Sequence, residues 1–338
     1  MKSWILSFLL LRPGLATADG SDGRAFLDWE SDPVTELKRV LSALEDRQDP
    51  PAAAAKAQEA EERQKKLDVA RFDDLMKKIE KGQAVDQKDL EWAKSNLSAG
   101  LASKKVLMIV TSHDQLGNTG EKTGFWMEEL AAPYLLFGKS GLAVDIASPK
   151  GGAAPADRRS LDNPPEVVKS FLSSKEAVEK LKATLALDKI DGGYDAYFVV
   201  GGHGVLWDLV YHAGLQKLLS GAYEKGGIVA AVCHGPAALT EVRLKNGDPL
   251  VKGRKVSGFS NDEEKAAKLD GVVPFALETK LKSLGGLYES GAMWASFAVR
   301  DGRLVTGQNP ASSEAVAAKI LEALKEELGK RLASAKTK

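Results

Sequence analysis

The chain has 338 residues, with 47 Lys or Arg balanced by 47 Asp or Glu. That balance excludes a strong field for nucleic acid or an anionic membrane, and no apolar run reaches the length of a bilayer span. The chain has only one cysteine, which excludes an intrachain disulfide, so the fold must rest on a hydrophobic core in one or two domains.

The first 18 residues resemble a secretory signal peptide. An apolar run over residues 4–11 follows Lys2, Arg12-Pro13 ends it, and Ala16-Thr17-Ala18 offers small residues for cleavage. This predicts export to a periplasm or to the medium. The alternatives are an uncleaved apolar N-terminus or a start codon assigned too far upstream, and either would leave the protein in the cytoplasm.

Residues 19–100 predict a helical extension. Apolar residues recur at helical spacing over 37–44, and Pro50-Pro51 interrupts the chain. Residues 52–81 are rich in Ala, Glu, Lys and Gln, which favour helix, and a shorter helix is predicted to end near Gly100. Nothing in this segment indicates chemistry or a specific partner, so its role is left unassigned.

From residue 101 to 330 apolar strands alternate with helical stretches. We expect strands near residues 106–111, 143–148, 197–200 and 228–232, with a helical insertion over 165–186. Asp301-Gly302 predicts a hairpin turn, and a helix over 311–328 precedes a tail at 331–338. This pattern is typical of an α/β fold with a doubly wound, mostly parallel sheet flanked by helices, as in flavodoxin. In such sheets the site lies beyond the carboxyl ends of the strands, which places Thr111, Gly202 and Cys233 near one edge.

Cys233 follows the predicted strand 228–232 directly and precedes Gly235 and Pro236. Proline suits the first position of a helix, so the run predicts a strand, a sharp turn and a helix, with the thiol at the turn. A thiol facing a helix N-terminus has a lowered pKa, and the turn chemistry is that of a nucleophile elbow. The alternative is a buried cysteine acting as a small hydrophobic residue.

Several further motifs stand in order along the chain. They are Thr123-Gly124-Phe125-Trp126-Met127-Glu128-Glu129-Leu130, Gly201-Gly202-His203-Gly204, Ala231-Val232-Cys233-His234-Gly235-Pro236, Ser257-Gly258-Phe259-Ser260-Asn261 and Thr306-Gly307-Gln308-Asn309-Pro310-Ala311-Ser312. With them, the chain from residue 105 resembles the ThiJ/PfpI superfamily, which has the class I glutamine-amidotransferase-like fold. The resemblance is strongest to its branch of glyoxalase III and heat-shock-protein-31-like chaperones.

The resemblance implies a set of site residues. Cys233 corresponds to the nucleophile and His234 to the catalytic histidine, whose imidazole titrates near neutral pH. The backbone N–H groups of Gly202 and His234 correspond to the oxyanion donors, and Gly201 and His203 are expected to complete the substrate-binding loop.

Two carboxylates are expected beside this pair. A carboxylate usually orients a catalytic histidine, and alignment favours Glu264 over Glu263 and Asp262. Glu129 corresponds to the glutamate that lies against the sulfur, with Glu128 as its rival. A buried carboxyl there would have a raised pKa and could move a proton.

The resemblance implies a cofactor-independent lyase of the glyoxalase III type, a lactate dehydratase that converts methylglyoxal, a small reactive aldehyde, to lactate in a stress response. No cofactor and no metal are expected, and neither nucleic acid nor, after signal removal, a membrane is an expected partner. The alternatives are a holding chaperone, a protein deglycase, or a cysteine amidohydrolase or peptidase. Dimers are common in the family, but the sequence does not fix the oligomeric state.

Overall fold

The computed structural model describes residues 52–337, which belong to one compact unit. The predicted signal peptide at 1–18 and the predicted helix around 37–44 lie outside the described residues. Within the described part, no helix combines the length and apolar character needed to cross a bilayer.

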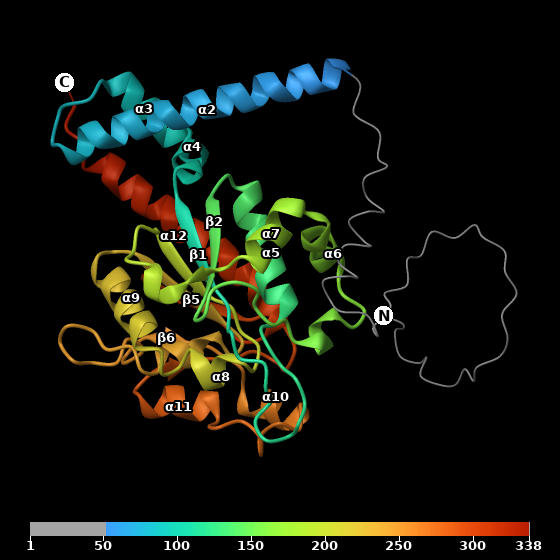
Figure 1. The fold of residues 1–338 in the computed structure, drawn as a ribbon. Helices are drawn as coiled ribbons and strands as arrows, with labels where there is room; N and C mark the ends of the chain where they lie inside the picture. Colours follow the sequence, from blue (N-terminus) through green and yellow to red (C-terminus); the bar gives the residue numbers. More distant parts are fainter. Residues whose placement is uncertain (1–51, 338) are drawn as a thin grey trace, which may run out of the picture. The chain divides into compact units, whose positions relative to one another are not determined.

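The unit is built on a seven-stranded sheet with the order β3-β2-β1-β4-β5-β9-β8 (Figure 1). All neighbouring strands are parallel except β8 and β9, which form the antiparallel hairpin predicted at Asp301-Gly302. The strands are β1 (Lys105–Ile109), β2 (Ala143–Ser148), β3 (Leu185–Ala186), β4 (Ala196–Val199), β5 (Ile228–Val232), β8 (Ala298–Asp301) and β9 (Leu304–Gly307). The central order β2-β1-β4-β5-β9 is that of flavodoxin, so the predicted fold class is confirmed.

The order in which successive strands join the sheet reverses between β1 and β4. The connection from β1 through α5 (Met127–Lys139) leads to β2 on one side, whereas that from β4 through α9 (Ala213–Glu224) leads to β5 on the other. Because crossovers between parallel strands are right-handed, these two helices cover opposite faces of the sheet. The two connections leave β1 and β4 toward opposite sides, which opens the carboxyl edge between these strands. Functional sites of such folds lie at this edge.

The strands are apolar throughout because both faces of the sheet are covered. One row of residues in register across four strands is completely buried: Met108, Phe198, Ala230 and Val305. The remaining helices are α6 (Glu166–Ser173), α7 (Lys175–Lys182), α8 (Val205–Asp208), α10 (Asn261–Ala266), α11 (Leu277–Ser283) and α12 (Ser313–Ala333), with 3-10 turns η1 (Arg158–Leu161), η2 (Leu187–Lys189), η3 (Gly235–Leu239) and η4 (Pro310–Ser312). A separate parallel pair joins β6 (Lys255–Val256) to β7 (Leu287–Tyr288).

The described part of the extension forms α2 (Ala52–Glu80), α3 (Gln87–Ser95) and α4 (Leu97–Ala102). The second half of α2 is not a separate appendage, because Phe72 and Leu75 belong to the same buried core as the sheet. Gly100 permits this packing, since a Cβ there would lie 2.5 Å from the Phe72 ring. The chain end also returns to this region, where Val85 forms a parallel bridge with Thr337.

Candidate active site

The turn after β5 holds Cys233 in a strained backbone conformation. Its φ is +57°, one of four positive values among the described non-glycine residues, and the residue is 4% exposed. The next glycine is required because a Cβ at Gly235 would lie 2.4 Å from the carbonyl oxygen of Val199. A left-handed residue at a functional turn is typical of stored backbone strain, so the predicted nucleophile elbow is present.

Two backbone N–H groups act on the thiol, those of Gly202 and His234. Gly202 has a φ of +95°, and a Cβ there would lie 2.4 Å from the carbonyl oxygen of Gly124. Only glycine therefore lets this loop close against the segment that precedes α5. The two N–H groups are placed where an oxyanion on a carbon bonded to the sulfur would need donors.

Glu129 lies in the first turn of α5 and is completely buried, whereas Glu128 is only half-buried. Its Oε2 accepts the N–H of Gly201 at 2.8 Å, and a Cβ at Gly201 would meet both this oxygen and the Cβ of Cys233. The Glu129 carboxyl therefore lies against the thiol across Gly201, and its Oε1 has no nitrogen or oxygen partner among residues 52–337. The N–H of Gly201 thus holds Glu129, and the expected place of Gly201 in the substrate-binding loop stays a prediction.

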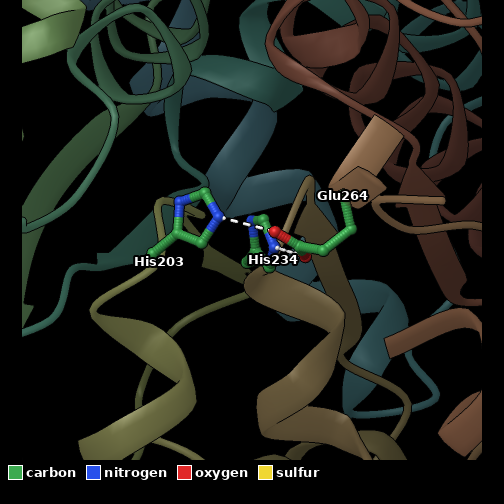
Figure 2. Close-up of side chains that lie close together, drawn as sticks. All are labelled: His203, His234 and Glu264. Carbon is green, nitrogen blue, oxygen red and sulfur yellow. Dashed lines mark hydrogen bonds and ion pairs between the residues drawn. The ribbon is translucent and has the colours of Figure 1, made fainter. Parts of the chain in front are cut away.

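His234 connects the thiol to a carboxylate. Its Nδ1 is 3.5 Å from the Cys233 sulfur, and its Nε2 is 2.8 Å from Oε2 of Glu264. An ionised carboxylate can only accept, so Nε2 carries the hydrogen and the Nδ1 of the neutral ring is free to take the thiol proton. Figure 2 shows His234 and Glu264 together with His203. The Nε2 of His203 lies 2.9 Å from Oε1 of the same Glu264.

The three candidate carboxylates of α10 point in different directions. Asp262 is exposed. Glu263 is completely buried, but its oxygens accept from Ser260, the N–H of Trp294 and the amide of Asn309. Only Glu264 reaches the histidines, because successive side chains of a helix turn by about 100°. The capping box of Ser260 and Glu263 fixes the first turn and so aims Glu264.

Burial decides the charge of each group. Burial and the nearby Glu129 raise the pKa of the Cys233 thiol well above its usual value, and the two N–H groups offset this only in part. The sequence-based expectation of a lowered thiol pKa was wrong, because burial and the neighbouring Glu129 outweigh the backbone N–H groups of Gly202 and His234. Burial also raises the pKa of Glu129 well above its ordinary range. For Glu264 burial opposes ionisation, but the two histidines outweigh it and hold its pKa well below the ordinary value.

The sequence motifs did not reveal the roles of two further residues. The Phe259 ring lies 4.4 Å from the His234 ring and restricts its rotation. Arg159, half-exposed and paired with the buried Asp157 at 2.6 Å, lies close enough for its charge to act on His203 and Glu264. The only sequence signal for Arg159 was its position in the segment that follows the predicted strand 143–148, at the expected edge of the sheet.

Metal ligation is possible at one place in the described part of the chain. His203, His234 and Glu264 are buried and offer ligand atoms that lie within 4.8 Å of one another. Two imidazoles and a carboxylate suit Zn²⁺. These same atoms form the hydrogen bonds that orient His234, so a bound ion would displace them.

The family of the chain follows from comparison with known proteins. The model of the DJ-1/PfpI family matches residues 122–323, which include every site residue described above. The chain therefore belongs to the DJ-1/PfpI family, also called ThiJ/PfpI, and the resemblance seen in its motifs is confirmed.

Similar proteins include two named glyoxalases. The chain is 33% identical to glyoxalase 3 of Candida albicans over 239 residues, covering 65% of this chain and 98% of that protein. It is 34% identical to the glutathione-independent glyoxalase HSP31 of Saccharomyces cerevisiae over 247 residues, covering 67% and 100%.

Solved structures of similar proteins also match the chain. The structure of glyoxalase III from Candida albicans matches with a TM-score of 0.57 at 31% identity, covering 65% of this chain and 97% of that one. The Rapid Encystment Protein of 24 kDa from Francisella tularensis matches with a TM-score of 0.63 at 38% identity, covering 65% and 99%.

Proposed function

We propose that this protein is a glutathione-independent glyoxalase that converts methylglyoxal and water to lactate. The observation that carries the proposal is the buried Glu129 carboxyl against the Cys233 thiol, next to a histidine already oriented by Glu264. The similar proteins named as glyoxalases support the same reaction class.

The first step is addition of the thiol to the aldehyde carbon. His234 takes the thiol proton at Nδ1, and Glu264 stabilises the resulting imidazolium. The sulfur bonds to the aldehyde carbon, whose oxygen becomes an oxyanion facing the N–H groups of Gly202 and His234. Return of a proton to that oxygen gives a hemithioacetal, in which the neighbouring ketone is intact.

The second step moves hydrogen between the two carbons. A base removes the C–H proton of the hemithioacetal while the ketone oxygen takes up a proton, which gives an enediol. A proton then adds to the former ketone carbon as the hydroxyl on the sulfur-bearing carbon loses its proton. Glu129, with help from His234, is the group suited to this exchange, because burial raises the pKa of its carboxyl well above the ordinary range and so helps it to hold a proton taken from carbon. The product is a lactyl thioester, and the internal transfer of hydrogen requires no external oxidant.

The third step is hydrolysis. Water adds to the thioester carbonyl, whose oxyanion uses the same two N–H groups, and lactate leaves as the thiol regains its proton. Hydrolysis of an amide would need the cysteine and histidine but would give no task to a buried carboxyl at the sulfur. Glu129 therefore favours the glyoxalase reaction over the amidohydrolase alternative.

The decisive assay supplies methylglyoxal to the purified protein without glutathione or added metal and measures lactate. We expect the wild type to form lactate and Cys233→Ala to lose at least about 1,000-fold in kcat/KM, because the covalent route is closed. Equal, weak signals from the two proteins would refute the proposal.

A holding chaperone would require exposed apolar surface. Residues 54–66 of α2 are exposed but consist mainly of Ala and charged or amide side chains, and Leu67 is the large apolar exception. The described part of the extension therefore gives this alternative little support. Suppression of aggregation that survives Cys233→Ala would be its characteristic sign.

A further inference from the structure

One carboxylate at the site serves two imidazoles. Each oxygen of Glu264 has one ring as partner: His234 at Oε2 and His203 at Oε1, at 2.8 and 2.9 Å (Figure 2). Both Nε2 atoms must carry hydrogen, because the ionised carboxylate only accepts. The hydrogen bond from His203 thus holds Oε1 of Glu264 in place. Without it, the carboxylate could rotate and its two oxygens could exchange positions opposite His234.

His203 is held firmly enough to act in this way. It is 6% exposed, and its ring lies 4.1 Å from that of His234 and 6.1 Å from that of Phe259. The ring points to Glu264 (Figure 2), and the expected place of His203 in the substrate-binding loop stays a prediction. His203 therefore supports the catalytic pair through its hydrogen bond to Glu264.

The hydrogen-bond geometry carries the inference, and the charge of His203 agrees with it. Burial, and then the like charge of His234, lower the pKa of His203 to about 4. At neutral pH the ring therefore donates a hydrogen bond without bringing a positive charge. A cationic residue here would neutralise Glu264, whereas a neutral donor leaves the whole carboxylate charge to stabilise the imidazolium of His234.

We propose that His203 is a positioning residue: its Nε2–H fixes the Glu264 carboxylate, which in turn fixes the His234 tautomer whose bare Nδ1 accepts the proton of Cys233. The inference rests on the proposed function only in assigning the proton transfer to Cys233 and His234. It goes beyond that function because it gives a role to a side chain whose hydrogen bond is to Glu264 and not to the reacting atoms.

Two substitutions separate the hydrogen bond from the space that the ring fills. His203→Phe keeps the ring and removes the donor, whereas His203→Gln places an amide N–H near the position of Nε2. We expect His203→Phe to lower kcat roughly 10- to 100-fold with KM changed by less than about threefold, the loss typical of a hydrogen bond to a charged group. His203→Gln should recover kcat to within about fivefold of the wild type.

A merely structural role predicts a different pattern. Both variants would then lose activity in proportion to the loss in free energy of unfolding, measured with urea. Wild-type kcat in His203→Phe, or equal impairment of the two variants, would overturn the proposal.

A second readout does not depend on turnover. The chain has four histidines, so long-range ¹H–¹⁵N spectra of its imidazoles can be assigned by single substitutions, with His212→Gln as the control outside the site. We expect His234 to show the neutral Nε2–H tautomer in the wild type and in His203→Gln. In His203→Phe its two nitrogen shifts should approach each other as the tautomers mix.

In His203→Phe the rate of Cys233 alkylation by iodoacetamide should also fall, because thiolate formation uses the same Nδ1 of His234. If the wild type makes no lactate but the spectra and alkylation still depend on residue 203, the proposed function fails and the positioning role stands. An unchanged His234 spectrum in His203→Phe would refute the positioning role whatever the activity.

Discussion

The two edges of the parallel sheet differ in what they do with polar groups. At the carboxyl edge, Cys233, His234, Glu129 and Glu264 are buried and in contact within one small cluster. At the amino edge, a groove of about 970 Å³ lies between α9 and α12. Lys104, Asp191, Asp195 and Arg303 line it from segments that precede strands, and Lys217 lines it from α9.

Several charges of this groove serve the fold. Lys104 pairs with Asp195 at 2.9 Å, and Asp195 also accepts the N–H of Lys105 at the start of β1. Arg303 stacks on Tyr223. Chemistry requires groups whose protonation is displaced from its ordinary state, and burial at the carboxyl edge provides them.

The strongest test of this contrast compares two adjacent glutamates of α5. Glu129→Gln should lower kcat for lactate formation by roughly 10²- to 10⁴-fold, the usual contribution of an acid–base group. Glu128→Gln is the matched control, because that residue is only half-buried and should stay within about threefold. Similar losses in the two variants would show that the buried carboxyl is not the proton carrier.

A second pair lies at the start of α10. Glu264→Ala removes the acceptor of His234 and should lower kcat roughly 10- to 100-fold. Glu263→Ala leaves buried donors of Ser260, Trp294 and Asn309 without their acceptor, and should cost about 3 kcal/mol or more in free energy of unfolding. Urea unfolding and steady-state kinetics on both proteins would separate the catalytic effect of Glu264 from the structural effect of Glu263. A larger loss of kcat in Glu263→Ala than in Glu264→Ala would contradict this assignment.

The low pKa of His203 predicts a dependence of stability on pH. The unfolded chain takes up a proton on this residue below about pH 6.5, while the folded protein does so only near 4. The free energy of unfolding should therefore fall by about 2 kcal/mol between about pH 6.5 and 4.5 through this group. His203→Gln should lack that component, which urea titrations at the two pH values would measure as a double difference. An identical pH dependence in both proteins would argue against a buried neutral ring.

The smallest effect is expected at the amino edge. Lys217→Ala and Asp191→Ala should leave kcat/KM for methylglyoxal within about twofold of the wild type, because exposed substitutions far from the reacting groups rarely cost more. A loss above tenfold in either variant would mean that the groove participates in turnover, and the contrast between the two edges would fail.

Much of the fold could be read in advance because its signals are local. The run Ile228–Val232 has the apolar character of a doubly covered strand, and the structure forms β5 over the same residues. Asp301-Gly302 specified a hairpin, and the alternation of strands and helices specified a parallel sheet. The second half of α2 was harder to place, because its packing on α12 depends on distant partners such as Leu328 near Gly100.

The features of the site also divide into those that the local sequence predicted and those that depend on contacts between distant segments. By itself the sequence identified Cys233 at a sharp turn, and family motifs pointed to Gly202, His234 and the two carboxylates. Their sequence spacing could not say that Gly201 would hold Glu129 or that His203 would turn toward Glu264, because both depend on loops that meet only after folding. Tertiary structure alone decided the protonation states. A pKa shift depends on how much water is removed and which charges face the group, and burial here raised the thiol pKa that the helix turn was expected to lower.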